Sequence, residues 1–217
     1  MIPLGQVAGN PDVRFGWYLR PSYAMCRAQA EMHDLLRRQF GLLAGGAFMP
    51  HATIKGFFRS DAPLVDLVAA GDRAVAGRRP FQVVNNGPVP LGRSGIALDI
   101  HHDETGRRNQ ALRALHDAAW EALLPLVHPA CEFTPREWAG DRFFAHLTLA
   151  MADIPDFAFD EILAFVRDAG PIGPRRFVAA HVHLFAFQSD DWAGPWWETL
   201  RWRLLHSWQL GADPVPG

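Results

Sequence analysis

The chain contains very little lysine and very little cysteine. Of its 21 lysine and arginine residues only Lys55 is a lysine, and Cys26 and Cys131 are its only cysteines. Two cysteines without a recognisable spacing do not make the framework of a disulfide-stabilised secreted domain, so we expect two thiols in a reducing cytoplasm. The sequence also lacks an apolar run of membrane-spanning length and a basic N-terminal segment followed by an apolar core. We therefore expect no membrane anchor and no signal peptide.

A surplus of positive charge is missing too, since the net charge is −2 at pH 7. Proteins that coat long nucleic acids usually carry such a surplus, so binding to long nucleic acid is not expected, although a local basic cleft remains compatible. The sequence has no GxSxG turn, no Walker-type glycine loop and no dinucleotide-binding fingerprint. With 217 residues and 49% hydrophobic content, we expect one compact domain spanning residues 1–217 that works as a monomer.

One short motif is present twice. The tetrapeptides His-Ala-Thr-Ile and His-Leu-Thr-Leu occupy residues 51–54 and 146–149. In a strand, side chains two residues apart share a face, which pairs His51 with Thr53 and His146 with Thr148. Two imidazoles and two hydroxyls would supply a general base, a general acid and two neutral donors to an anionic oxygen. The motifs therefore favour chemistry on a phosphodiester without a metal ion.

The sequence around the motifs is also duplicated. Each motif is followed by a helical pattern, an arginine pair and a strand-like segment, with Asp61 expected to cap the first of these helices. Landmarks in the two copies are separated by 146 − 51 = 95, 175 − 78 = 97 and 177 − 81 = 96 residues. Nearly constant spacing indicates two copies of one unit.

A long amphipathic pattern precedes each motif. Ser22 is expected to cap a helix that ends at Gly41, and apolar residues recur at helical spacing over residues 112–123. Strands are expected at residues 13–19, 82–84, 96–101, 178–187 and 199–209. These elements predict an α+β domain of two similar lobes, each an antiparallel sheet backed by helices.

Two further residues are candidates for contacts with the substrate. Lys55 lies two residues after Thr53, so regular alternation places its ammonium group on the motif face, beside a reacting phosphate. The simpler interpretation is that a lone lysine lies there by chance. Phe144 lies two residues before His146 and either borders the end of the site that binds a base or belongs to the core.

Two alternatives to a metal-independent enzyme stay open. His181 and His183 share a strand face, as metal-binding pairs often do, which would suit a metal-dependent hydrolase. A third ligand at a suitable spacing is missing from the sequence, so we expect no metal and no cofactor. The second alternative is a non-catalytic nucleotide-binding module of the same fold. Intact histidine and threonine at all four motif positions argue against it.

The paired motifs in duplicated α+β units resemble the 2H phosphoesterase superfamily, which contains 2′-5′ RNA ligase-like proteins and cyclic nucleotide phosphodiesterases. The specific part of the resemblance lies in residues 50–54 and 145–149. It implies a bilobed fold with a central cleft and metal-independent hydrolysis of 2′,3′-cyclic phosphates or related diesters, with 2′-5′ ligation as the reverse reaction. The substrate would be a small nucleotide or an RNA terminus.

The resemblance also implies roles for the motif residues. His51 and His146 would be the acid–base pair, and Thr53 and Thr148 would bind the phosphate. Many ligase-like members carry a basic residue shortly after the second motif, whereas this chain continues with alanine and methionine at positions 150 and 151. That departure leaves Lys55, or an arginine such as Arg14 or Arg142, to supply positive charge.

Overall fold

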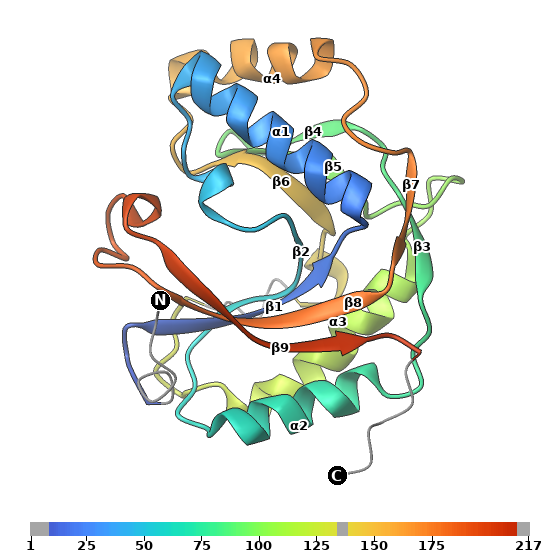
Figure 1. Cartoon of the computed structure of the whole chain (residues 1–217), viewed down its shortest axis with the longest axis vertical. Coiled ribbons are helices and arrows are strands. Elements are labelled where there is room, and N and C mark those ends of the chain that lie inside the picture. Colours follow the sequence, from blue (N-terminus) through green and yellow to red (C-terminus); the bar gives the residue numbers. More distant parts are fainter. Residues whose placement is uncertain (1–8, 134–138, 212–217) are drawn as a thin grey trace.

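The computed structural model describes residues 9–133 and 139–211 (Figure 1). Along the chain the principal elements are β1 (Val13–Arg20), α1 (Tyr23–Phe40), β2 (Ala52–Phe58), α2 (Leu64–Val75), β3 (Phe81–Val84), β4 (Pro88–Leu91), β5 (Gly95–Asp99), α3 (Gln110–Leu123), β6 (His146–Met151), α4 (Phe159–Asp168), β7 (Arg176–Ala179), β8 (His181–Gln188) and β9 (Arg201–Gln209). The predicted α+β class is confirmed. Of the helices in this described part, none is long and apolar enough to cross a membrane.

The strands form a seven-stranded sheet and a two-stranded sheet, both antiparallel. The large sheet has the order β4-β5-β6-β2-β1-β8-β9, and β3 pairs with β7 in the small one. The two parts of the large sheet meet between β2 and β6 at a single residue pair, Ala52 opposite Leu147. These two residues are the second positions of the two motifs, each between the histidine and the threonine. The duplicated motifs therefore lie side by side at the centre of the molecule.

The pairing of residues between strands indicates a pseudo-twofold axis. In the small sheet Phe81 lies opposite Ala179, and Val83 lies opposite Phe177. Shifting the first pair by the repeat offset, 81 + 96 = 177 and 179 − 96 = 83, gives the second pair. The central pair of the large sheet maps onto itself, since 147 − 52 = 95. The structure confirms the internal duplication, and the axis passes between the motifs.

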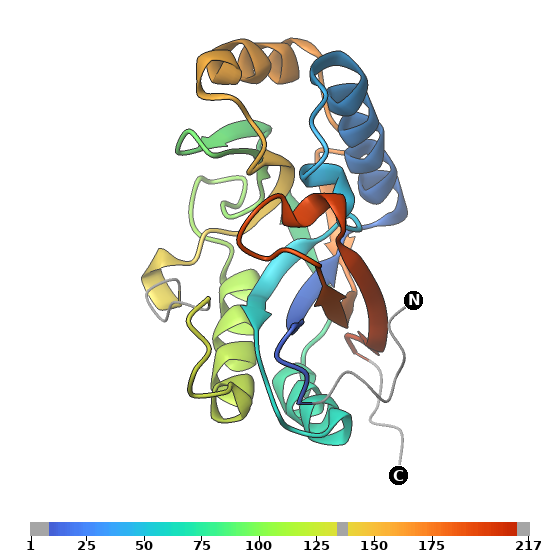
Figure 2. The same ribbon diagram turned by 90° about the vertical axis from the view of Figure 1, so that its left-hand side faces the viewer.

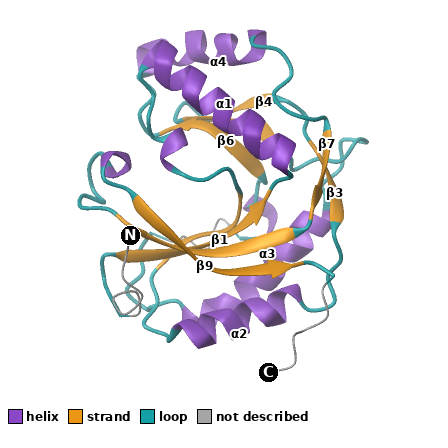
Figure 3. Cartoon of the chain, in the orientation of Figure 1, coloured by secondary structure: helices purple, strands orange, loops and turns teal. Residues whose placement is uncertain are grey.

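The lobes do not coincide with the two halves of the sequence. Helix α1 packs against β6 of the second half, and α3 packs against β2 of the first. Helix α3 also lies beside α2, while Phe40 of α1 meets Phe165 of α4 edge-on with ring centroids 5.0 Å apart. Figures 1 and 2 show α1 with α4 at one end of the molecule and α2 with α3 at the other. The large sheet runs between these helix pairs (Figure 3).

Local signals in the sequence predict the ends of α1 correctly. The Ser22 hydroxyl accepts a hydrogen bond from the Met25 amide at 3.4 Å, and Gly41 adopts a left-handed φ of 74° just past the last turn. The predicted cap of α2 is wrong, because this helix begins two residues later, after Pro63. Asp61 instead lies 3.2 Å from Nε2 of His128.

Two other expectations concern the C-terminal strands. The segment expected as one strand over residues 178–187 is two strands in different sheets, β7 and β8, separated at Ala180. The expected final strand is confirmed as β9, and Trp208 on it packs against α2. A Cβ atom added at Gly71 of α2 would lie 2.2 Å from the Trp208 ring, so glycine permits this close approach.

Candidate functional site

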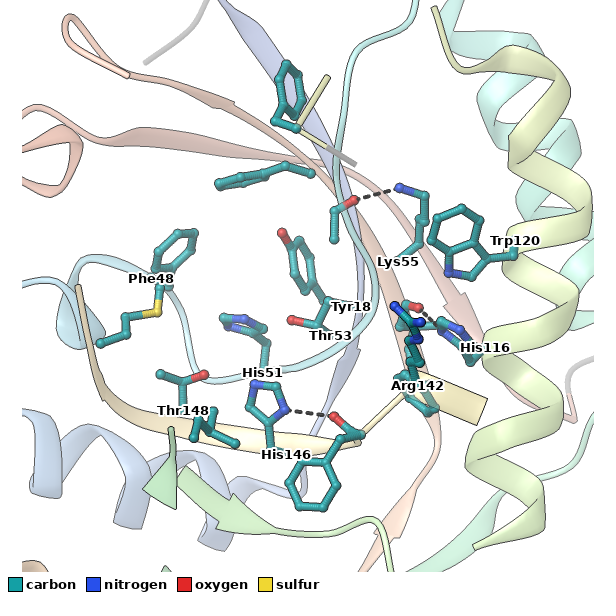
Figure 4. A pocket seen from close by; sticks show the side chains of 18 residues that line it. Tyr18, Phe48, His51, Thr53, Lys55, His116, Trp120, Arg142, His146 and Thr148 are labelled. Carbon is teal, nitrogen blue, oxygen red and sulfur yellow. Dashed lines mark hydrogen bonds between the residues drawn. The ribbon is translucent and has the colours of Figure 1, made fainter. Parts of the chain in front are cut away.

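A cavity of about 570 Å³ lies where the two motif strands meet (Figure 4). Its walls include His51, Thr53, His146 and Thr148, so the structure brings both motifs into one space. None of the described residues that line it is acidic, whereas Lys55 and Arg142 on its walls are basic. A cavity bordered by charges of one sign attracts the opposite charge, so this one suits an anion.

The two motif histidines are held by equivalent hydrogen bonds. Nδ1 of His51 lies 2.7 Å from the carbonyl oxygen of Met49, and Nδ1 of His146 lies 2.8 Å from that of Phe144. A carbonyl oxygen only accepts, so each Nδ1 carries a hydrogen and donates it. Nε2 of each neutral ring is then the nitrogen that keeps a lone pair. Both histidines are thus fixed in the tautomer that a base needs at Nε2.

Burial disfavours the charged form of both rings. Burial first, and then positive charge on His146 and His33, lower the pKa of His51 to about 4, against the opposing effect of its hydrogen bond to Met49. Burial also lowers the pKa of His146. Both imidazoles are therefore neutral at pH 7 until an anion binds beside them, because a nearby negative charge favours protonation.

Aromatic side chains frame the two histidines differently. The ring of Tyr18 meets His51 edge-on at 4.6 Å between centroids, and Phe48 lies 5.6 Å away. His146 faces Phe144 at 6.0 Å with an interplanar angle of 19°. Phe144 lines the cavity, as do Tyr18 and Phe48, which sequence reasoning did not single out. Tyr18 reaches the site because it lies opposite Thr53 on the neighbouring strand β1.

Lys55 does not share the face of the motif residues, so the expectation from regular alternation is wrong. Thr53 lies opposite Tyr18, but Lys55 lies opposite Trp17, so two neighbours on β1 face residues two apart on β2. The extra residue, Ile54, shifts the alternation, as a β-bulge does. The side chain of Lys55 consequently leaves the sheet on the same face as that of Trp17, whose ring is buried in the core.

The ammonium group of Lys55 still lines the cavity, at its α3 side. Its Nζ lies 4.6 Å from the ring centroid of Trp120, and Figure 4 shows the two side chains together, away from the histidine pair. Burial lowers the pKa of Lys55 to about 7.

The two arginines considered as alternative cations have different positions. Arg142 ends the short helix Gly140–Arg142 just before β6, is exposed and lines the cavity. Arg14 does not line the cavity itself, although its guanidinium lies 4.0 Å from the ring of Phe133, which does, and 3.8 Å from that of Trp192. Arg142 is therefore the better placed of the two to meet an anionic substrate.

Two histidines outside the motifs bind the motif strands across the pseudo-twofold axis. Nε2 of His33 in α1 lies 2.9 Å from the carbonyl oxygen of Thr148, and Nδ1 of His116 in α3 lies 2.6 Å from that of Ile54. Each bond ties a helix of one half to the motif strand of the other. Sequence reasoning missed both histidines. The signal that could have found them is a repeated His-Asp dipeptide, starting at position 33 in one long helix and at position 116 in the other.

His181 and His183 are occupied by other contacts. Nδ1 of His181 lies 3.0 Å from Arg20 Nη2, and Nδ1 of His183 lies 2.7 Å from the Ser207 hydroxyl. Across residues 9–133 and 139–211, no group of three or more histidine, cysteine, aspartate or glutamate residues could hold a metal ion. The described residues thus supply no third ligand for the metal-dependent alternative.

Comparison with known proteins finds similarity in structure but not in sequence. No family model and no curated protein matches the chain. TT0787 of Thermus thermophilus is 16% identical with a TM-score of 0.61, over 91% of this chain and 97% of that one. Escherichia coli LigT complexed with 3′-AMP is 14% identical with a TM-score of 0.51, over 92% and 98%. A phosphoesterase crystal structure is 16% identical with a TM-score of 0.50, over 91% and 97%.

At this low sequence identity, the structural similarity establishes the fold alone, and the chemistry has to be argued from the residues of the site. The chain has the fold of these proteins over nearly its whole length and over nearly theirs. The resemblance to the 2H phosphoesterases that the two motifs suggested is confirmed at the level of the fold.

Proposed function

We propose that residues 1–217 form one metal-independent phosphodiesterase domain of the 2H phosphoesterase superfamily. Its substrate would be a 2′,3′-cyclic phosphate or a related diester of a small nucleotide or an RNA end. The observation that carries this proposal is the pair of histidines, His51 and His146, held by equivalent Nδ1 hydrogen bonds in one cavity. Two imidazoles with fixed tautomers can supply the general base and the general acid for an in-line displacement at phosphorus.

The reaction begins with water attacking phosphorus opposite the leaving alkoxide. Nε2 of His51 takes the proton of the water, and Nε2 of His146, protonated, gives a proton to the leaving oxygen. We assign the base to His51 because burial lowers its pKa to about 4, with positive charge on His146 and His33 acting in the same direction. A ring that resists protonation is the better candidate for the neutral partner. The bound phosphate stabilises the imidazolium form of the other ring.

Charge that accumulates on the non-bridging oxygens needs donors. Thr53 and Thr148 line the cavity beside the two histidines and provide one hydroxyl each. Arg142 lines the same cavity and adds a full positive charge without a proton transfer. Donors that are already in place lower the barrier because they need no reorganisation in the transition state.

The size of the cavity favours a nucleotide over a bare phosphate. Cavities of about 300 to 1,000 Å³ hold ligands of the size of a drug or nucleotide, and this one measures about 570 Å³. Among the structures that share the fold, LigT has been solved with 3′-AMP, with NADP+ and with phosphate. The same acid–base pair can act on a ribose 5′-hydroxyl in place of water. That hydroxyl loses its proton and attacks phosphorus, the 3′ oxygen leaves with a proton, and a 2′-5′ linkage forms.

A screen of cyclic and linear phosphodiesters in the presence of EDTA tests the proposal. We expect turnover of at least one nucleoside 2′,3′-cyclic phosphate under chelation. Loss of all turnover that returns with a divalent ion would support the metal-dependent alternative. Tight nucleotide binding without hydrolysis of any diester would support the non-catalytic module instead.

A further inference from the structure

The two histidines that tie the helices to the motif strands use different ring nitrogens. His33 binds the carbonyl of Thr148 through Nε2, whereas His116 binds the carbonyl of Ile54 through Nδ1. His116 lines the cavity and His33 does not. The pseudo-twofold symmetry is therefore broken at this position, and only one of the two rings borders the space for substrate.

The second nitrogen of His116 is buried and has nothing to bind. Only 3% of the residue is exposed, and among the described residues its Nε2 has no hydrogen-bond partner. Nδ1 must carry the hydrogen, because the carbonyl oxygen of Ile54 only accepts, so Nε2 of the neutral ring is an acceptor. A buried acceptor without a donor costs free energy that a ligand can recover.

Aromatic rings surround this acceptor. Phe143 stacks on the His116 ring with centroids 3.8 Å apart and an interplanar angle of 9°, and Trp120 lies edge-on at 6.0 Å. Phe133 lines the cavity as well. Figure 4 shows His116 and Trp120 on the α3 side, across the cavity from His51 and His146. The cavity thus has a phosphate end at the motifs and an aromatic end at α3.

We propose that the aromatic end is a nucleobase subsite in which His116 Nε2 accepts a hydrogen bond from an N–H group of the base. The proposal rests on the function proposed above, in that the phosphate of the same ligand lies at the motif histidines. A base fits because it combines flat apolar faces with N–H donors at its edge, which aromatic walls and a lone acceptor complement.

A second phosphate is a poorer occupant of this end. Phosphate oxygens accept hydrogen bonds, so they would meet the lone pair of His116 Nε2 unfavourably. Protonating the ring would remove that conflict, but burial lowers the pKa of His116 and keeps the ring neutral. Lys55 lies at the same end, but burial lowers the pKa of its amine to about 7, which weakens its attraction for a second phosphate. The acceptor of His116 selects for a donor on the ligand.

Calorimetric binding to the full chain tests the subsite without requiring turnover. The probes are adenosine, cytidine and uridine 3′-monophosphates, an abasic ribose phosphate and inorganic phosphate. We expect the nucleotides to bind at least about tenfold more tightly than the abasic probe, in line with the contribution of base stacking and one hydrogen bond. In His116→Phe, which keeps an aromatic ring, this ratio should fall by about two- to tenfold.

His33→Phe is the control, because it removes the corresponding histidine bond to a motif strand, while Gln29 Nε2 of the same helix keeps its bond to the Thr148 oxygen at 2.9 Å. It should leave the ratio of nucleotide to abasic affinity unchanged, whatever it does to binding of phosphate itself. A ratio that is the same in His116→Phe as in the wild type would overturn the subsite. Failure of all phosphate probes to bind would instead count against the proposed function. A ratio that falls equally in both variants would indicate a general loss of structure and would also overturn the subsite.

Discussion

The two motif halves are alike in their hydrogen bonds and unlike in their surroundings. Each histidine donates from Nδ1 to the carbonyl two residues earlier, at 2.7 Å in one half and 2.8 Å in the other. His51 is enclosed by Tyr18 and Phe48, whereas His146 faces only Phe144 among the described rings in contact with it. The duplicated backbone thus gives both histidines the same tautomer, while the different neighbouring side chains give them different electrostatic surroundings.

The different surroundings allow two histidines on a symmetric backbone to have different roles in one reaction. An acid and a base must differ in protonation at the same pH, so two identical half-sites would compete for the same state. The chain separates them through neighbours outside the motifs. Burial lowers the pKa of both rings, but positive charge on His33 lowers that of His51 further, whereas the hydrogen bond to the Phe144 carbonyl raises that of His146.

Removing either motif histidine should have the largest effect. We expect His51→Ala and His146→Ala each to reduce kcat by about 10² to 10⁴, the range for loss of a general acid or base. The double variant should lose far less than the product of the two single effects, because both groups act in one transition state. Steady-state kinetics with a 2′,3′-cyclic nucleotide measures this.

His206→Ala is the control for these variants. His206 is half-buried on β9 beside Trp208, at 4.5 Å between ring centroids, and does not line the cavity. Its replacement should leave kcat within about twofold, since the side chain makes no contact with the cavity. Near-full activity in a folded His51→Ala or His146→Ala variant would refute the acid–base assignment.

The second comparison is between the two cations of the cavity. Arg142→Ala should raise KM about 10- to 100-fold, since a charged hydrogen bond to phosphate is lost, and should weaken the salt dependence of kcat/KM. Lys55→Ala should also weaken binding of anionic substrate, but less, because its ammonium lies over Trp120 on the α3 side. Kinetics at low and high salt measure both. A larger effect at Lys55 would mean that the phosphate lies nearer α3.

Short-range signals explain why the motifs and most elements could be predicted. The His-x-Thr repeat, the constant offset and the caps of α1 are local patterns, and each has a local physical cause. The position of Lys55 could not be predicted, because the extra residue at Ile54 is visible only in pairing with β1. Tyr18 comes from the neighbouring strand β1 of the same half, and His116 comes from α3 of the other half. Neither contact can be read from the spacing of the motifs, and the repeated His-Asp dipeptide marks His116 without showing what it touches.

The two threonines should contribute smaller and similar effects. Thr53→Ala and Thr148→Ala each remove one neutral donor, so we expect a loss in kcat/KM of about two- to tenfold. Thr53→Ser and Thr148→Ser, which keep the hydroxyl, should recover most of the activity. A serine variant as impaired as its alanine counterpart would indicate that the methyl group, and not the hydroxyl, matters at that position.

The pH profile should show the smallest but most specific difference between the halves. Below its pKa, His51 is protonated and cannot take a proton; above its pKa, His146 is neutral and cannot give one. Because burial lowers both pKa values, kcat/KM should be greatest below pH 6.5, the ordinary pKa of histidine.

The same asymmetry can be changed through His33. Positive charge on this ring lowers the pKa of His51, so His33→Gln, which retains an amide donor for the Thr148 carbonyl, should move the acid limb of kcat/KM to higher pH. NMR titration of the imidazole C–H signals should show that the first proton taken up on acidification is held by His146. The kinetic profile reports macroscopic ionisations of the coupled pair, so only the resonances assign them to residues. If His51 took up that first proton, the roles of acid and base would be reversed while the pair itself would stand.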